Sequence, residues 1–312
     1  MPMPREIRQQ EECSYVFSRG LPAIATVVPA ETVIVYIEDA FTGDIKDPED
    51  LPSVVLAGQL NARTGPQYSQ GDEPADTLVV SIDAIEPMDN WAISVFVPFF
   101  GELSGTTATA MPHEALPERL YFYELENGWL RCGDRLRIPW RPFLGTLGTA
   151  LPLEAVSALT PHMHGGNMDV RDTGPGRTVY LPVYVEGARF LTGDAHANQG
   201  DGELCGVALE ITAKATLTFD LVKSKPIAWP RIESDEKIMA VGNARPMEDA
   251  AWIAYEELSD RMIAEYESDK LDAYQLLSQA GTIYVGNIDG HLLLAGGRDR
   301  EVVSGATIGV SL

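Results

Sequence analysis

The stretch Gly193-Asp194-Ala195-His196-Ala197-Asn198-Gln199-Gly200-Asp201-Gly202-Glu203 lies between two segments that are typical of β-strands. The apolar run before it covers residues 178–185, and the run after it covers 207–211. Val, Tyr, Leu and Ile are frequent in these runs, whereas glycines punctuate the polar stretch between them. We therefore predict two strands at these runs, with the polar stretch as a loop held between them, where rigid scaffolds carry chemistry.

Short β-rich runs dominate the first two thirds of the chain. They are separated by Gly, Pro and Asp, a pattern typical of β-sandwich or barrel architectures. The runs cover residues 23–28, 32–37, 77–82, 91–97 and 119–123. Strands and helices do not alternate here, which argues against a doubly wound nucleotide-binding fold.

The strongest helical pattern begins at Pro246 and is followed by Glu248 and Asp249 in what would be a first turn. Apolar residues then recur near helical spacing, and they are Met247, Ala251, Ala254, Leu258 and Met262. A second helix is predicted over 270–279, ending at Gly281. We predict a β catalytic body over residues 1–234 and an α+β part over 235–312 that packs on it.

The composition narrows the classes of partner. The chain has 312 residues with 46 acidic and 23 basic side chains, for a formal charge of -23. Such a charge disfavours binding to nucleic acid or to anionic membranes. Three scattered cysteines favour a reducing compartment, and we find neither a signal-peptide pattern nor an apolar run long enough to cross a bilayer. We expect a cytoplasmic protein that acts on a small molecule.

Two polar clusters contain residues that can bind a metal ion. Asp194 and His196 are separated by one residue, so on an extended chain both side chains would point to the same face. A second cluster, with His162, His164 and Asp169, precedes the first by about one strand pair, so the two can meet across a sheet. Together they offer the nitrogen and oxygen donors that suit zinc or a similar divalent ion.

Three segments resemble the acetamidase/formamidase family of amide hydrolases. These are HGGNMD at 164–169, YLPVYVEGA at 180–188 and GDAHANQGDGE at 193–203, and weaker similarity extends to residues 61–66, 142–148 and 273–277. The resemblance implies a β-sandwich or jelly-roll body, a smaller barrel-like β subdomain and a C-terminal α+β part. It also implies a homo-oligomer, a dimer or higher, that hydrolyses small amides at a divalent-metal site.

The chain departs from the family pattern near the expected pocket wall. Family members often carry Glu where this sequence has Tyr36. Glu38 lies two residues further, on the same strand face, and we take it as a fourth candidate metal ligand; Asp39 remains the alternative.

The chemistry of amide hydrolysis suggests a role for each residue. A metal ion polarises the carbonyl group and makes hydroxide available, and a carboxylate must carry the proton from water to the leaving nitrogen. We assign the metal to Asp169, Asp194 and His196 and the proton transfer to Glu203. His164 is a ligand or an oxyanion donor. Asn167 and Gln199 are candidates to hold the substrate amide.

Several alternatives remain open. The ion is expected to be zinc, with calcium or manganese as the other candidates. Glu210 either lines the site or pairs with a basic neighbour across a strand. His162 and His164 with Asp169 also resemble the metal spacing of a cupin-like oxygenase, and a jelly roll can be a non-catalytic module that binds a small ligand. The preferred reading is an amidase acting on a small linear amide of the formamide or acetamide type.

Overall fold

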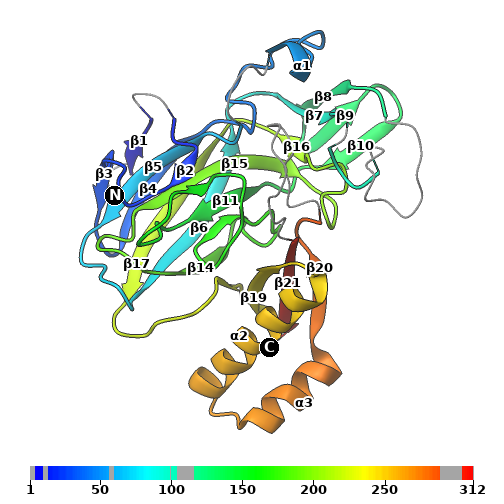
Figure 1. Ribbon diagram of the computed structural model, residues 1–312. Coiled ribbons are helices and arrows are strands. Elements are labelled where there is room, and N and C mark those ends of the chain that lie inside the picture. The colour runs from blue at the N-terminus through cyan, green and yellow to red at the C-terminus, as the bar shows by residue number, and fades with distance from the viewer. Residues whose placement is uncertain are drawn as a thin grey trace.

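The computed structural model describes residues 4–9, 13–55, 60–98, 100–103, 116–288 and 304–311. Within these ranges most of the regular structure is β, arranged in two large sheets that form the body of the molecule (Figure 1). Two helices stand at the C-terminal end. The expectation of a mainly β fold with a C-terminal α+β part is confirmed. The paths of both large sheets are open over the described residues, so the barrel-like subdomain stays a prediction.

The first sheet has nine strands among the described residues. Their spatial order is β1 (Arg5–Ile7), β4 (Glu31–Ile37), β17 (Ala213–Val222), β6 (Thr77–Pro87), β14 (Arg177–Pro182), β18 (Arg231–Glu233), β19 (Lys237–Ala244), β21 (Ser304–Ser311) and β20 (Thr282–Val285). Apart from the parallel pair β1–β4, neighbours in this sheet run antiparallel.

The second sheet has ten strands among the described residues. Eight form one path, β10 (Leu136–Pro139), β9 (Trp129–Cys132), β8 (Arg119–Glu126), β7 (Trp91–Phe96), β16 (Leu209–Glu210), β15 (Phe190–Asn198), β11 (Phe143–Gly148) and β13 (Gly165–Asn167). Off this path, β5 (Arg63–Ser69) pairs with β15, and β3 (Ala25–Val27) pairs with β5. A small third sheet joins β2 (Val16–Phe17) to β12 (Val156–Ser157), and a short helix α1 covers Pro52–Val55.

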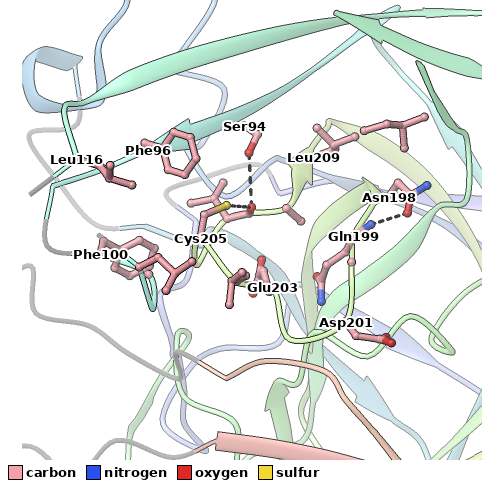
Figure 2. Close-up of a pocket in the computed structure, with 17 residues that line it drawn as sticks. Ser94, Phe96, Phe100, Leu116, Asn198, Gln199, Asp201, Glu203, Cys205 and Leu209 are labelled. Atoms are coloured by element: carbon pink, nitrogen blue, oxygen red, sulfur yellow. Dashed lines mark hydrogen bonds between the residues drawn. The ribbon is translucent and has the colours of Figure 1, made fainter. Parts of the chain in front are cut away.

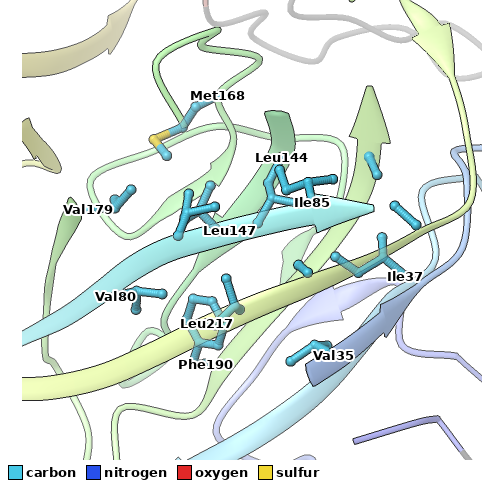
Figure 3. Packing of buried hydrophobic residues seen from close by; sticks show 14 of the residues in the cluster. Val35, Ile37, Val80, Ile85, Leu144, Leu147, Met168, Val179, Phe190 and Leu217 are labelled. Carbon is cyan, nitrogen blue, oxygen red and sulfur yellow. The ribbon is translucent and has the colours of Figure 1, made fainter. Parts of the chain in front are cut away.

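Alternation of side chains explains why the sheets stack. In β4 the residues Val33, Val35 and Ile37 are fully buried and their neighbours are partly exposed, as a strand with one face on a core requires. Leu217 on β17 and Val80 on β6 belong to the same core cluster, with residues of the second sheet across from them (Figure 3). This shared core fixes the second sheet, and with it the strands that carry the polar clusters.

The C-terminal part extends the first sheet. The predicted boundary at 235 falls in the turn between β18 and β19, which are hydrogen-bonded to each other, and β18 also pairs with β14 of the body. Helices α2 (Met247–Tyr266) and α3 (Lys270–Ala280) confirm the two predicted helices. The buried side of α2 includes Ala254, Leu258 and Met262 as predicted, but Ala250 is buried in place of Met247 and Ala251.

Over the described residues, no helix has the length and apolar character needed to cross a membrane.

Candidate active site

Strand β15 carries the two polar side chains that the sequence placed on one face. Ala195 and Ala197 pack into the core, while Asp194 Oδ1 lies 3.4 Å from His196 Nε2 on the other side of the strand. The predicted common face is therefore confirmed. The expectation of a loop from residue 193 is wrong, because β15 runs to Asn198. Partners on both sides, β11 and β5 with β16, satisfy the backbone of this segment and hold its polar residues in a strand.

Asp169 follows the short strand β13, and its side chain lies close to Asp194 and His196. Its Oδ2 accepts hydrogen bonds from Asn167 Nδ2 at 2.6 Å and from Asn287 Nδ2 at 2.7 Å. Its Oδ1 is buried and has no hydrogen-bond partner among the described residues. A buried carboxylate oxygen of this kind is costly unless a proton or a cation occupies it.

Two further carboxyl groups complete the cluster. Glu203 Oε2 accepts from Asn287 Nδ2 at 2.9 Å. Glu210 Oε1 accepts from the backbone N–H of Ala208 at 3.0 Å and lies 3.5 Å from His196 Nε2. In the part of the chain that the structure describes, Glu210 Oε2 has no hydrogen-bond partner. Glu210 lines the site and is also the cross-strand partner of His196, so the structure contains both of the arrangements that the sequence left open.

The potential ligand atoms fall into two overlapping groups, each with its atoms within 4.8 Å of one another. Asp169, His196 and Glu203 form one group, and Asp194, His196 and Glu210 form the other. All five side chains are buried. His196 is common to both groups and is the centre of the cluster.

Gly145 on β11 leaves the space in which these atoms converge. A Cβ built on Gly145 would lie 2.7 Å from Asp169 Oδ1, 2.7 Å from Asp194 Oδ2 and 2.9 Å from His196 Cε1. Two carboxylate oxygens from different segments therefore point to one spot beside the imidazole ring. The missing side chain lets both carboxylates and the ring pack against the backbone of β11, and the oxygen and nitrogen donors of the cluster are those that suit a divalent ion.

Gln199 fixes the orientation of the histidine ring. Its Nε2 donates to the carbonyl oxygen of Asp169 at 2.9 Å and to that of Gly286 at 2.8 Å. Its Oε1 is therefore the acceptor for His196 Nδ1, 3.0 Å away. With Nδ1 held by Gln199, Nε2 faces Asp194 and Glu210, and it becomes available to a metal ion when the ion displaces its proton, as in metal-ligating histidines.

A second set of hydrogen bonds links the residues that lie behind Asp194 and Asp169. Asn167 Oδ1 accepts from Asn61 Nδ2 at 2.8 Å and from the hydroxyl of Thr146. Thr146 in turn accepts from the guanidinium of Arg63 at 2.8 Å. Burial lowers the pKa of Arg63 to about 10, still well above neutral pH, so a fixed positive charge stands behind the carboxylates.

Burial and mutual repulsion set the protonation of the cluster. Burial, and after it the charge of Asp169, raises the pKa of Glu203 well above its usual range. Burial raises the pKa of Glu210 in the same way. Burial opposes ionisation of Asp194 too, but His196 and Arg63 outweigh it and lower its pKa. Glu210 and Asp194 raise the pKa of His196 to about 10 against the effect of burial. The cluster therefore holds protons that a bound cation would displace.

Several of these residues have unusual backbone conformations. The φ angles of Asn61, Asp169, Asp194 and Glu203 are 62°, 51°, 62° and 44°, all in the left-handed region. Such conformations are uncommon for residues other than glycine, and they gather at functional sites where the surrounding structure holds them. These backbone conformations orient the four side chains, and they cost conformational energy that residues in ordinary strands and turns do not incur.

The structure does not bring His164 or Glu38 into either ligand group. The His164 ring is fully buried and packs edge-on against Phe17, with centroids 4.7 Å apart, and burial lowers its pKa to about 3. Glu38 lines a separate cavity of about 740 Å³, and burial followed by the charge of Asp89 raises its pKa. The structure gives no support to the roles predicted for these two residues, nor to the cupin-like ligand set, because Asp169 groups with His196 and Glu203 instead.

Asn167 and Gln199 lie in the cluster, as predicted, but their amide groups are occupied by protein partners. These bonds favour a positioning role over the predicted contact with substrate. The predicted set also lacked several residues that the structure shows to be part of the site, namely Asn61, Arg63, Thr146, Gly145 and Asn287.

Comparisons with known proteins show to which class of protein this fold and this buried cluster belong. A family model described as the acetamidase/formamidase family matches residues 143–274, which include the strands and turns that carry Asp169, Asp194, His196, Glu203 and Glu210. The crystal structure of an acetamidase from Yersinia enterocolitica is 37% identical, covers 99% of this chain and 92% of its own, and superposes with a TM-score of 0.90. An acetamidase structure from Bacillus halodurans is 27% identical, with coverages of 98% and 97% and a TM-score of 0.87.

The chain belongs to the acetamidase/formamidase family. The formamidase of Methylophilus methylotrophus is a curated relative, 28% identical over 254 residues, which are 65% of this chain and 62% of that protein. The chain thus matches less than two thirds of the length of this relative.

Proposed function

We propose that this protein is a metal-dependent amidase that hydrolyses the C–N bond of an amide to a carboxylate and ammonia. Membership of the acetamidase/formamidase family supports the reaction. The observation that carries the metal dependence is that His196 is shared by two groups of buried ligand atoms, each with its atoms within 4.8 Å of one another.

The residues present fit a divalent ion in two further respects. Asp169 Oδ1 and Glu210 Oε2 are buried and have no hydrogen-bond partner among the described residues, so the site offers oxygens that lack a donor. Four carboxyl groups face one imidazole and one guanidinium, and burial raises the pKa of Glu203 and Glu210, so the cluster retains protons that a divalent cation would displace. The mixed nitrogen and oxygen set favours zinc, with manganese and calcium as alternatives.

We retain the predicted set of Asp169, Asp194 and His196 to hold the ion; His196 belongs to both ligand groups and each aspartate to one of them. A divalent ion there would polarise the amide carbonyl and lower the pKa of water. Glu210 accepts a backbone N–H and lies 3.5 Å from His196 Nε2, so it would orient the ring from the side opposite Gln199.

Glu203 would move the proton. It is the one carboxyl group of the cluster among the residues that line the neighbouring cavity, so it can reach both the water and the substrate nitrogen. Its raised pKa suits a group that must accept a proton from water and then donate it to the departing nitrogen. Water adds to the carbonyl carbon, the C–N bond breaks, and the nitrogen leaves with the proton.

The test is ammonia release by metal-stripped protein before and after addition of zinc, manganese or calcium. We expect activity only with metal, and we expect Glu203→Gln to retain the metal and lose about 10²- to 10⁴-fold in kcat. Ammonia release that is equal with and without metal would contradict the metal dependence. Full activity of Glu203→Gln would contradict the proton-transfer role.

A further inference from the structure

A cavity of about 560 Å³ opens next to the acidic cluster. Its walls come from β7, β10, β16 and the turn that follows β15, and Glu203 and Gln199 are the two cluster residues that line it (Figure 2). Its size is within the range of pockets that enclose ligands much larger than formamide. Formamide has roughly the volume of two water molecules at about 30 Å³ each, and would leave most of this space empty.

The cavity wall is largely apolar apart from the end at Glu203, which Gln199 and Asp201 also line; the carboxylate of Asp201 pairs with Arg171 at 2.5 Å. The apolar lining residues include Phe96, Phe100, Ile138, Leu204 and Leu209. Three polar side chains on the wall are engaged with backbone carbonyl groups. Asn198 Nδ2 donates to Pro139 at 2.6 Å, Cys205 Sγ to Val207 at 3.0 Å, and Ser94 Oγ to Val207 at 3.5 Å. A ligand in this cavity would meet apolar surface at one end and the carboxyl group of Glu203 at the other.

One wall of the cavity is formed where residues 100–102 pack closely against residues 204–206. Gly101 has φ +84°, and a Cβ on it would lie 2.7 Å from the carbonyl carbon of Cys205, so only glycine permits this approach. Gly206 has φ +75°, and a Cβ on it would collide with the ring of Phe100. The backbone N–H of Glu102 donates to Leu204 O at 3.0 Å. These contacts place Phe100 and Leu204 on the wall as parts of one packed unit.

We propose that the preferred substrate is an amide carrying one apolar group of about the size of a pentyl chain or a phenyl ring, which occupies this cavity while the amide faces Glu203. This inference rests on the proposed amidase function and names its substrate class. The reaction is unchanged: water adds to the carbonyl carbon, the C–N bond breaks, the acyl part leaves as carboxylate, and the nitrogen leaves with a proton as ammonia or as an amine.

The expected preference follows from burial of the apolar group. Each methylene that leaves water in the transition state raises kcat/KM about fourfold. From acetamide to hexanamide, kcat/KM is therefore expected to rise on the order of 100-fold. The assay compares formamide, acetamide, butanamide, hexanamide and benzamide with zinc-loaded protein. N-pentylformamide is included to tell whether the apolar group belongs on the acyl side or on the nitrogen.

A rise in kcat/KM along the acyl series, or a preference for N-pentylformamide, supports the proposal and assigns the side. Formamide or acetamide as the best substrate, with hexanamide, benzamide and N-pentylformamide all slower, overturns it while leaving the amidase function intact. No hydrolysis of any amide in the presence of metal would overturn the proposed function, and with it the substrate class. The two failures are thus distinguishable.

The variant Ser94→Phe tests whether the preference for amides with a large apolar group arises in this cavity. Ser94 lies on β7 next to Phe96 on the cavity wall, and Ser94→Phe would place a ring in the space (Figure 2). We expect the ratio of kcat/KM for hexanamide to that for acetamide to fall at least tenfold. Leu153→Phe is the matched control, because Leu153 is 88% exposed and outside the cavity. An unchanged ratio in a folded Ser94→Phe variant would overturn the placement of the apolar group.

Binding measured without turnover gives a second readout. The dissociation constants of acetohydroxamate and hexanohydroxamate are compared with zinc-loaded protein by calorimetry. We expect hexanohydroxamate to bind at least tenfold more tightly, and Ser94→Phe to remove the difference. Equal affinity of the two hydroxamates for the unmodified protein would contradict an apolar subsite.

Discussion

One amide group, that of Asn287, donates to both Asp169 Oδ2 at 2.7 Å and Glu203 Oε2 at 2.9 Å. Asn287 follows β20 in the C-terminal part, whereas both carboxylates belong to the body. A single donor thus holds a proposed metal ligand and the proposed proton carrier at a fixed separation. The two carboxyl groups repel each other when both are ionised. The two hydrogen bonds from Asn287 oppose this repulsion and keep the groups close together.

Asn287→Leu would leave the two carboxylates without their common donor. We expect zinc affinity to fall about 10- to 100-fold, as for other groups that orient metal ligands. Calorimetric titration of metal-stripped protein with zinc measures it. Asn90→Leu, at an exposed position, is the control. Wild-type affinity in Asn287→Leu would show that Asp169 is held without this bond.

Gly145→Ala tests the space in which the ligands converge. The substitution adds one methyl group 2.7 Å from Asp169 Oδ1 and Asp194 Oδ2, and Gly145 has no left-handed φ that alanine would strain. We expect a folded protein that retains less than a tenth of the bound metal, measured by elemental analysis after gel filtration. In Gly20→Ala the new Cβ would meet its nearest neighbour at 3.6 Å, and metal content is expected to be unchanged. Full metal content in Gly145→Ala would place the ion elsewhere.

Gln199→Leu removes the partner that holds Nδ1 of His196 and so orients the ring. We expect zinc affinity to fall about 10- to 100-fold, because Nε2 is then no longer held towards the neighbouring carboxyl groups. Calorimetric titration of metal-stripped protein with zinc measures the affinity, and Asn90→Leu serves as the control at an exposed position. Unchanged zinc affinity in Gln199→Leu would contradict this role.

Asp72 and Asp76, four residues apart in the sequence, should affect stability with opposite signs. Burial raises the pKa of Asp72 to about 6, so the folded state binds an extra proton. Stability is therefore lost as pH rises from about 4 to about 6, and Asp72→Asn should raise the Tm at pH 7 by about 2 to 4 °C with little gain below pH 4.

For Asp76 burial opposes ionisation, but Lys223 and backbone N–H groups outweigh it and lower the pKa. Its carboxylate accepts from Lys223 Nζ at 2.6 Å and from the N–H of Ser224 at 2.8 Å. The stabilisation is present above about pH 4 and is lost on further acidification. Asp76→Asn should lower the Tm at pH 7, and the loss should shrink towards pH 3. Calorimetric scans from pH 3 to 8 compare both variants, and Tm changes of the same sign at pH 7 would refute the assignment.

Local patterns in the sequence predicted much of the fold. Alternating and apolar runs gave strands such as β4 and β7, and helical spacing gave α2 and α3, because these signals depend on neighbours within a few residues. The common face of Asp194 and His196 was predictable for the same reason. The loop expected at residue 193 was wrong because polar residues inside a buried strand look like a loop until their partners are known.

Contacts between distant segments explain what could not be predicted. Asn287 and Asp169 are separated by 118 residues, and no short motif marks Asn287. Gln199 was recognised as part of the site, but its role depends on the carbonyl oxygen of Gly286, 87 residues away. Gly145 has no side chain, so only the folded structure shows the atoms that a methyl group would meet.

The continuation of the first sheet from β18 into β19 has a consequence for the site. The same C-terminal segment that lengthens the sheet supplies Asn287 and the Gly286 carbonyl to the site. The proposed ligand Asp169 and the proposed proton carrier Glu203 therefore take their final positions only when residues 286 and 287 have docked on the body. Any variant that weakens docking of the C-terminal segment is expected to disturb the site, however far from it the change lies.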